Sequence, residues 1–434
     1  MNGIEIITVF FLLLIALLIL GIPVGYSVAV TSIVAFVIKW GYPDLSFGLI
    51  AQMLVYGINN FPILAVPLFL LVGALMNESG ITNRLFNFAS SLVGHIRGGL
   101  AHVNVLGSMI FSGMSGAAAA DAAGIGQVEI KAMEDAGYDK DFSCAVTAAS
   151  ATIGPVIPPS VPMVLFGVLA NVSVSKLFIG GLIPGVLMGL SQMGLCAIIS
   201  KRRGYPKGDR FHVNYLIKSF KMAFLTLMAP VIIIGGIWTG VFTATEAAGV
   251  AAMYAGILGI LVYRKIKFKA LTSILKKVSI DSAAIMFILA CAQIYSTALT
   301  RTQVPEEILN ILFSVSKDPL VIILILNLFL FIAGCFMSTA ETIALLTPLL
   351  APLFPKFGID PLHFGVIMVL NLMIGQMTPP FGVVLYVLVR VGNIPFDRLV
   401  KACIPFYFPT FVVLLLIIFF PSIVTFLPSA VFGR

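Results

Sequence analysis

A pair of adjacent prolines interrupts an apolar segment twice in this chain, and the two interruptions have matching sequences. Ile153-Gly154-Pro155-Val156-Ile157-Pro158-Pro159 recurs as Ile374-Gly375-Gln376-Met377-Thr378-Pro379-Pro380, at an offset of 221 residues. Each proline removes a backbone donor and clashes with the preceding turn, so neither stretch is one continuous helix. Free backbone groups at membrane depth are tolerated only where protein or a watery cavity surrounds them. Two matching broken helices therefore predict a solute site near the middle of a membrane.

Small polar residues beside the breaks suit a cation and an anion. Na+ takes several oxygen ligands, which unwound backbone and nearby hydroxyls supply, whereas the half-helix N-termini after the proline pairs suit the carboxylate of an organic anion. We predict no other cofactor. The predicted sodium ligands are Ser112, Gly113, Ser115, Gly116, Thr152, Gly154, Val156, Ser338, Thr339, Gly375, Met377 and Thr378. The predicted substrate-binding residues are Ser115, Pro158, Pro159, Ser160, Ser338, Thr378, Pro379 and Pro380. Taken singly, each serine, threonine or glycine is better explained by close helix packing. Their twofold recurrence beside a double break favours the site.

Four acidic residues fall within predicted membrane segments. Because a carboxylate near the middle of a bilayer costs at least ~2.5 kcal/mol, each is a functional candidate. Asp121 and Glu341 follow the two serine-containing turns that face the breaks, where they would attract the ion or anchor the turn. Glu246 and Asp281 lie near the ends of predicted spans, where a structural hydrogen bond or an interfacial position explains them equally well.

The composition excludes an ordinary soluble domain, because 60% of the residues are apolar, 10% are charged and the mean hydropathy is +1.10. We predict an all-α polytopic protein in a lipid bilayer. Its basic residues gather in the segments 201–221 and 264–277, which the positive-inside rule places in the cytoplasm, so the net charge of +8 does not indicate nucleic-acid binding. Both termini are then periplasmic. The first apolar run has no basic leader and is expected to be a retained helix.

Further positions repeat at the same offset, including Gly137 with Gly358 and Asp139 with Asp360. Counting crossings from the basic segments puts Asp139 in the cytoplasm and Asp360 outside. Equivalent positions on opposite faces define an inverted-topology repeat, which many secondary transporters share. Each repeat also carries a segment too interrupted to cross, which we interpret as a re-entrant hairpin.

The repeats divide into matching parts, in which amphipathic arm helices along the membrane surface would join a fixed scaffold to a moving core. Interfacial loops are the alternative interpretation of the arms. The first repeat, 1–199, is predicted to contain scaffold spans 1–78, an arm helix 79–97, a hairpin 98–136, a broken helix 143–172 and a span 176–199. After a basic cytoplasmic loop 200–221, the second repeat, 222–434, contains scaffold spans 222–300, an arm helix 303–317, a hairpin 319–357, a broken helix 364–392 and a last span 400–428.

Four segments, 60–67, 93–100, 112–116 and 155–160, closely resemble the large membrane subunit of tripartite ATP-independent periplasmic (TRAP) transporters, and the likeness extends over essentially the whole chain. The resemblance implies sodium-driven uptake across the bacterial inner membrane by an elevator motion of the transport core. It also implies a small four-helix membrane subunit as partner and a periplasmic solute-binding protein that delivers the cargo. The segment 171–178 is similar to members that carry sialic acid, and similar proteins carry dicarboxylates or sugar keto acids. The second turn, 337–341, lacks the glycine pairs of the first, so the two ion sites need not be equivalent.

Two other functions fit part of the sequence. The segment 113–116 matches the GxSG pattern of rhomboid intramembrane proteases, in which Ser115 would be the nucleophile, but such a serine needs a histidine base at the same depth. The four histidines fall at predicted span ends or in loops. A channel is the second alternative, although inverted pairs of broken helices suit alternating access better than an open pore. The chain has no GxxxxGK[ST] motif, so ATP is not the direct energy source.

Overall fold

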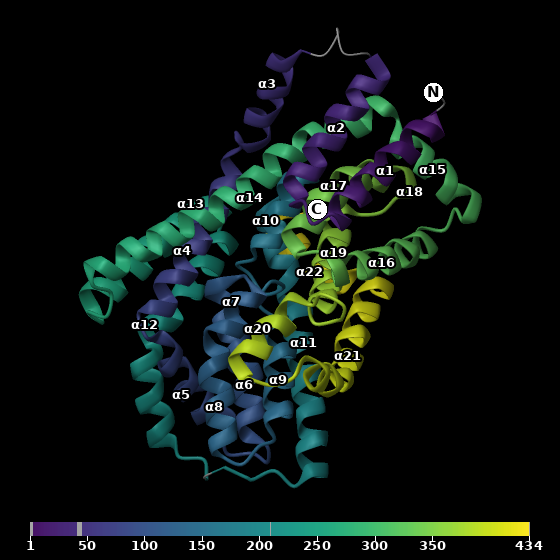
Figure 1. The fold of residues 1–434 in the computed structure, drawn as a ribbon. Helices are drawn as coiled ribbons and strands as arrows, with labels where there is room; N and C mark the ends of the chain where they lie inside the picture. The colour runs from purple at the N-terminus through teal and green to yellow at the C-terminus, as the bar shows by residue number, and fades with distance from the viewer. Residues whose placement is uncertain (1–2, 41–45, 209, 434) are drawn as a thin grey trace.

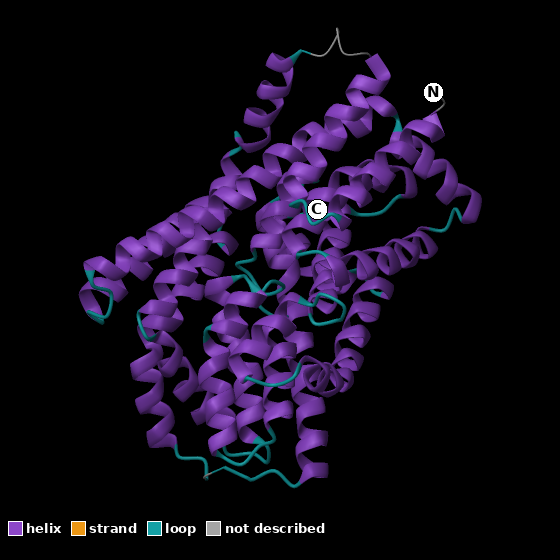
Figure 2. Ribbon diagram, viewed as in Figure 1, coloured by secondary structure: helices purple, strands orange, loops and turns teal. Residues whose placement is uncertain are grey.

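The computed structural model describes residues 3–40, 46–208 and 210–433, and within these ranges the chain is built from helices and turns with no β-strand (Figures 1 and 2). A single isolated bridge pairs Arg97 with Lys207. Seven helices of the described residues are long and apolar enough to cross a membrane. The structure therefore confirms the predicted all-α polytopic class.

The segments predicted as scaffold contain helices from both repeats, and among them the long oblique helix α14 contacts α2, α3 and α4 (Figure 1). The first repeat contributes α1 (Gly3–Ile19), α2 (Val24–Trp40), α3 (Phe47–Ile58), the short helix η1 (Phe61–Leu64) and α4 (Ala65–Glu78). The second repeat contributes α12 (Val213–Trp238), α13 (Ala244–Ile257), η2 (Leu258–Val262) and α14 (Phe268–Thr302). Since α12 begins at Val213, the loop before it is shorter than the predicted 200–221.

The remaining helices lie in the segments that were predicted to form the arms and the core. In the first repeat they are the arm α5 (Ile81–Val93), the hairpin helices α6 (Gly99–Ser115), α7 (Ala118–Ala123) and α8 (Ile125–Asp135), the broken helix α9 (Lys140–Ala151) and α10 (Val161–Leu169), and α11 (Val174–Arg203). In the second they are the arm α15 (Val304–Val315), the hairpin helices α16 (Pro319–Phe336) and α17 (Thr339–Leu350) with η3 (Ala351–Leu353) and α18 (Phe354–Phe357), and the broken helix α19 (Pro361–Gln376) and α20 (Val383–Gly392).

Left-handed backbone residues mark corresponding turns of the two repeats. Such a conformation is uncommon outside glycine, so its recurrence at matching positions reflects a shared chain path. One pair precedes the arm helices, one follows the hairpins and one follows the half-helices α10 and α20. These pairs are Gly80 with Gln303, Gly137 with Gly358, and Asn171 with Asn393.

The two repeats interlock in the core. The half-helix α10 of the first repeat packs on α17 of the second hairpin, and α20 packs on α7 of the first hairpin. Each hairpin is also fixed to its own broken helix by a buried asparagine. The Asn104 amide donates to the Thr147 hydroxyl over 2.7 Å, and Asn371 donates to the side-chain oxygen of Asn327 over 2.7 Å. Because a buried polar group left without its partner costs ~1–3 kcal/mol, these bonds hold hairpin and broken helix together.

The end of the chain differs from the predicted single span 400–428. The structure divides this segment into α21 (Phe396–Phe419) and α22 (Ser422–Phe432). Pro421 lacks a backbone donor and disfavours helical geometry at Phe420, which has φ −123° and ψ 78°, so the helix stops there. Helix α22 then packs against α11 and α19.

Candidate functional site

The first break is buried and satisfies most of its hydroxyls internally. Residues 151–160 are all buried, and the bond between the two prolines is cis. The Thr152 hydroxyl donates to the Ala149 carbonyl over 2.6 Å. The Ser160 hydroxyl donates to the Pro155 carbonyl and accepts from the Met163 N–H over 3.2 Å, so Ser160 caps the half-helix α10.

The turn of the first hairpin lies directly on this break. Gly116 has a φ of +64°, and a Cβ there would lie 2.5 Å from the Pro159 carbonyl oxygen. Asp121, in the next helix, is 0% exposed, and a Cβ at Gly154 would lie 2.2 Å from its carboxylate oxygen Oδ2. The structure therefore brings together five residues of the predicted first site: Gly116, Asp121, Gly154, Pro159 and Ser160.

Other predicted residues of the first site contact different helices. A Cβ at Gly113 would lie 2.6 Å from Cβ of Pro230 in α12, so Gly113 faces the scaffold. The Val156 carbonyl lies against Gly181 of α11, and the Ser112 hydroxyl donates to the Ser108 carbonyl over 2.5 Å. The side chain of Ser115 lies outside the described part of the structure.

The second break follows the same chain path as the first break, but its residues are more exposed. Pro379 is half-buried and Pro380 is exposed, and the bond between them is also cis. The Thr378 hydroxyl donates to the Ile374 carbonyl over 2.7 Å, and the Met377 carbonyl accepts from the Tyr407 hydroxyl over 2.7 Å. Two oxygens predicted to bind sodium are therefore already engaged by protein groups here.

The second hairpin also contacts its break. The Phe381 N–H donates to the Cys335 carbonyl over 3.1 Å, and the Gln376 side-chain amide donates to the Thr339 hydroxyl. A Cβ at Gly375 would lie 2.6 Å from the carbonyl carbon of Gly334, so α16 and α19 meet backbone to backbone. Each hairpin turn thus meets the break of its own repeat.

Two of the four acidic residues serve as helix caps. The Ser338 N–H donates to the Glu341 carboxylate over 3.1 Å, and the Ser338 hydroxyl accepts from the Glu341 N–H, which forms a capping box. Glu246 forms the same box with Thr243 at the start of α13, and Asp281 is exposed. Asp121 alone among these four combines full burial with contact to a break.

A fifth acid, Glu129 in α8, was missed by sequence reasoning. Its side chain is 0% exposed, and neither carboxylate oxygen has a hydrogen-bond partner among the described residues. A Cβ at Gly107 in α6 would lie 2.8 Å from its Oε1. In the sequence, Glu129 stands close to Lys131, Glu134 and Asp135 at the end of the hairpin. The helical spacing of Ile125, Glu129 and Met133 was the available signal, because it puts Glu129 on the apolar face.

A second missed feature is a chain of buried hydroxyl and amide groups behind the first break. The Ser150 hydroxyl donates to the Asn104 side-chain oxygen over 2.6 Å and lies 3.0 Å from the Ser108 hydroxyl. The Gln192 side chain donates to the Ala149 carbonyl over 3.1 Å. These contacts fix the end of α9 between the hairpin and α11.

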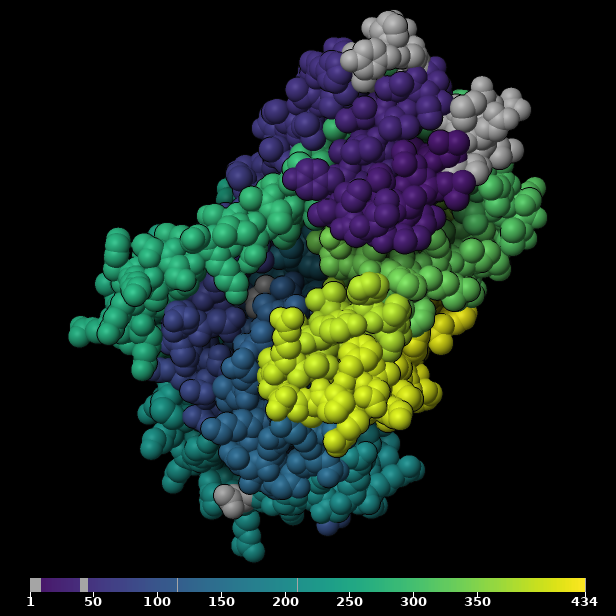
Figure 3. All heavy atoms as spheres, in the orientation of Figure 1, coloured from purple at the N-terminus to yellow at the C-terminus, as the bar shows by residue number. Residues whose placement is uncertain are grey.

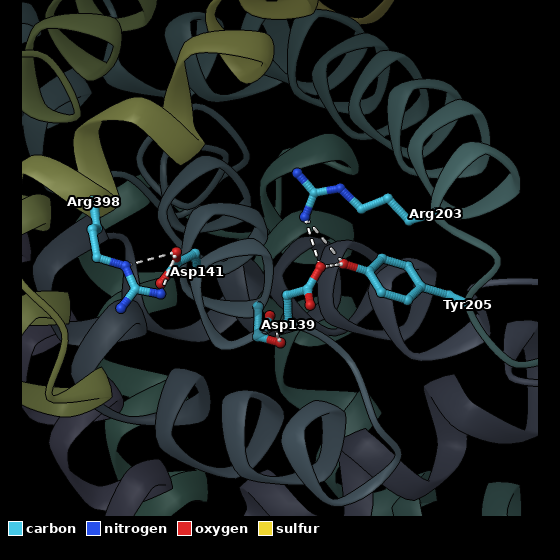
Figure 4. A network of polar contacts seen from close by, with 6 residues as sticks. Asp139, Asp141, Arg203, Tyr205 and Arg398 are labelled. Carbon is cyan, nitrogen blue, oxygen red and sulfur yellow. Dashed lines mark hydrogen bonds and ion pairs between the residues drawn. The ribbon is translucent and has the colours of Figure 1, made fainter.

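Two ion pairs tie the start of the first broken helix to neighbouring helices (Figure 4). Asp139 accepts from the Tyr205 hydroxyl over 2.6 Å and from the Arg203 guanidinium over 2.9 Å. Asp141 accepts from two nitrogens of Arg398 at 3.0 and 2.8 Å. The Tyr205 hydrogen bond, aided by the adjacent Arg203, lowers the pKa of the Asp139 carboxyl below its usual value of 3.8.

A cavity of about 340 Å³ lies between scaffold and core, and it includes part of the segment that resembles sialic-acid carriers. The space-filling view also shows a hollow between α14 and the segment that contains α20 (Figure 3). Most groups that line the cavity are neutral, with amides and hydroxyls among them: Asn60, Phe61, Pro62, Gly167, Val168, Asn171, Val172, Ser173, Val174, Ser175, Thr243, Ala244 and Thr245.

Comparison with known proteins places the chain in a family. Residues 11–423 match the family model of the tripartite ATP-independent periplasmic transporter, DctM component. The chain is 46% identical over 420 residues to the sialic acid TRAP transporter large permease protein SiaM of Vibrio cholerae, covering 96% of this chain and 97% of that protein. It is 42% identical over 426 residues to the sialic acid TRAP transporter permease protein SiaT of Haemophilus influenzae, covering 97% of this chain and 68% of that protein.

The fold has a counterpart of known structure. The Alcanivorax borkumensis YdaH transporter, whose crystal structure is described as having an unusual topology, superposes with a TM-score of 0.61 over 85% of this chain and 87% of that chain, at 12% identity. The chain belongs to the DctM family of TRAP transporter large permeases. Members of this family are membrane transporters and not enzymes, so the serine-protease alternative for Ser115 is rejected.

Proposed function

We propose that this permease carries an organic anion into the cell together with Na+, and that the two hairpin–break contacts form the ion and substrate sites. The observation that carries the proposal is the contact of each hairpin turn with the break of its own repeat. Gly116 lies on Pro159 in the first repeat, and Thr339 accepts from Gln376 in the second. Such discontinuous helices supply backbone oxygens to cations and N–H groups to anions.

Sialic acid is the first candidate for the cargo, and a dicarboxylate or a sugar keto acid is the alternative. The relatives SiaM and SiaT are named for sialic acid, and the similarity covers nearly the whole chain. The residues 171–175, which line the cavity between scaffold and core, provide amide and hydroxyl groups that suit a polyhydroxylated acid.

In the proposed first sodium site, the backbone around Gly116, Thr152 and Gly154 supplies oxygen ligands and Asp121 supplies a buried negative charge. In the second, the ligands come from Ser338, Thr339, Gly375 and Thr378, which carry no formal charge. Sodium would fasten each hairpin to its break, and the anion would then bind between them. Each net positive charge carried inward through a 100 mV potential contributes about 2.3 kcal/mol, so an excess of sodium drives accumulation.

An elevator movement of the core relative to the scaffold is the proposed route across the membrane. The arm α5 packs against α6 of the core and α12 of the scaffold, and α15 contacts α14 and α17. Both arms therefore join the two parts in the way that hinged movement requires. We further propose a location in the bacterial inner membrane with periplasmic termini, a small four-helix membrane subunit as partner, and a periplasmic solute-binding protein as the source of cargo.

Reconstituted transport tests the proposal. The permease is placed in liposomes with its small subunit, the binding protein is added outside, and uptake of labelled sialic acid is measured with and without an inward Na+ gradient. We expect saturable uptake that requires both Na+ and the binding protein, and exchange in a counterflow assay. Uptake that is independent of Na+ would contradict the coupling, and unsaturable conductance would support a channel.

A further inference from the structure

A second cavity, separate from both hairpin–break contacts, opens at the end of the first arm helix. It has a volume of about 730 Å³ and lies between α5, the start of α6 and the segment that joins α11 to α12. The positive-inside rule puts this end of the molecule in the cytoplasm. Its lining residues are Ser90, Ser91, Gly94, His95, Gly99, Leu100, Ala136, Tyr138, Pro206, Lys207, Gly208, Arg210, Phe211, His212, Asn214 and Tyr215.

The walls of this cavity are fastened to one another by backbone contacts. The Gly98 N–H donates to the Pro206 carbonyl over 3.1 Å, and Arg97 forms a β-bridge with Lys207. A Cβ at Gly208 would lie 2.1 Å from the Gly94 carbonyl oxygen, so the backbones of these two segments are in direct contact. The segment after α11 is therefore held against the junction of arm and hairpin, and the cavity between them is part of the fold.

The polar groups that face the cavity favour a negatively charged ligand. Lys207 and Arg210 carry the formal charges, and no described lining residue is acidic; Asp209 lies outside the described residues. Neither cation has an ion-pair partner in the described part of the chain. The Nδ1 atom of His95 is buried and lacks a hydrogen-bond partner there, while its ring meets the Phe211 ring edge to face. A ligand with several acceptor oxygens would satisfy these groups.

We propose that this cavity binds a phosphate group, either the headgroup of an acidic phospholipid or a soluble phosphate. Phosphate oxygens accept from lysine, arginine and histidine together, and basic pockets at the cytoplasmic side of membrane helices bind acidic headgroups. The segment between α11 and α12, two helices long and apolar enough to cross a membrane, forms one wall, which places the cavity at the level of the headgroups. The bound group bridges the arm, the base of the first hairpin and the α11–α12 segment, and so stabilises their junction. This inference goes beyond the proposed transport function.

Lipid binding to the purified permease tests the proposal without any transport measurement. The protein is placed in nanodiscs of phosphatidylcholine, with or without phosphatidylglycerol, and thermal unfolding and lipid retention by native mass spectrometry are compared. We expect phosphatidylglycerol to raise the unfolding temperature and to be retained. The double variant K207A/R210A is expected to bind it about tenfold more weakly, since each basic residue near the membrane surface contributes to headgroup affinity.

The matched control is K201A/R202A, which removes the same charge from the exposed last turn of α11, outside the cavity. A second double variant, K207R/R210K, keeps both positive charges and is expected to keep binding phosphatidylglycerol. It therefore distinguishes loss of binding through loss of charge from loss of binding through misfolding. Stabilisation by phosphatidylglycerol but not by inorganic phosphate identifies a lipid site, and protection by inorganic phosphate identifies a soluble ligand. Equal losses in K207A/R210A and the control, or no effect of either ligand on the wild type, would overturn the proposal.

Discussion

The two hairpin–break units follow the same chain path but differ in burial and charge. In the first unit the break is buried and Asp121 lies against it, whereas in the second Pro380 is exposed and Phe381 is 57% exposed. The second acid, Glu341, caps its own helix instead of reaching the break. Inverted repetition therefore reproduces the backbone path of a hairpin–break contact, while individual side chains decide whether a buried carboxyl group lies beside it.

The largest expected effect comes from placing a side chain on the first hairpin turn. Gly116→Ala adds a Cβ 2.5 Å from the Pro159 carbonyl and a left-handed backbone penalty of ~1–2 kcal/mol. We expect uptake in liposomes to fall about hundredfold. Gly137→Ala is the matched control, because Gly137 also has a positive φ but has nothing within 4 Å of its Cβ position. Equal losses in both variants would show that backbone strain, rather than contact with the break, causes the effect.

The difference in charge is tested by neutralising one acid in each unit. Asp121→Asn replaces the buried carboxyl group beside Gly154, which is the proposed source of negative charge in the first sodium site, and should raise the half-saturating Na+ concentration about tenfold, since interactions with charged groups contribute ~1.5–3 kcal/mol. Glu341→Gln should change it less than about threefold, because glutamine also completes a capping box. Sodium titrations of uptake measure both. Similar shifts in the two variants would remove the proposed distinction between the sites.

The side-chain contact in the second unit should have a smaller effect. Thr339→Val removes the acceptor of the Gln376 amide and leaves a buried group unpaired, which costs ~1–3 kcal/mol. We expect a lower unfolding temperature and weaker Na+ dependence. The comparison variant in the first unit is Thr152→Val, because the Thr152 hydroxyl donates to the Ala149 carbonyl of the preceding turn and its loss should matter less. If Thr152→Val lowered the unfolding temperature and the Na+ dependence more than Thr339→Val did, the contact between Thr339 and Gln376 would not be the more important of the two.

The smallest effect is expected at the ion pairs that start the first broken helix. Asp139 has a pKa below its usual 3.8, so its stabilising effect is present above that value and is lost as the pH falls through the lowered pKa of the folded protein. Asp139→Asn should lower the unfolding temperature only slightly at neutral pH, because the pair is exposed, and should remove part of the acid sensitivity. Thermal unfolding across the acidic range measures this. If the unfolding temperature of Asp139→Asn fell with pH as it does in the wild type, other carboxyl groups would be responsible for the acid sensitivity.

The sequence could predict features that depend on local chemistry. The proline pairs locate the breaks, and the amphipathic stretches locate α5 and α15, because backbone geometry and helical periodicity are written in neighbouring residues. The positions of the hairpins followed from polar interruptions of apolar runs. The sequence placed Asp121 within a membrane segment, and the structure shows that its side chain is buried; its contact with Gly154 was not available from the sequence.

Features that depend on tertiary packing could not be predicted. The burial of Glu129 depends on how α8 packs on α6, and the pair Asp141–Arg398 joins residues from different repeats. Gly113 faces Pro230 because the first hairpin packs beside α12, which is a tertiary contact. A repeat offset aligns positions along the chain, but it does not state which way each side chain or carbonyl points.

The interlocked half-helices have a consequence for either half on its own. Helix α10 finds its packing surface on α17, and α20 finds its surface on α7, so each half covers the other. A polypeptide with only one of these halves would leave that apolar surface to be covered by a sister molecule inserted in the opposite direction.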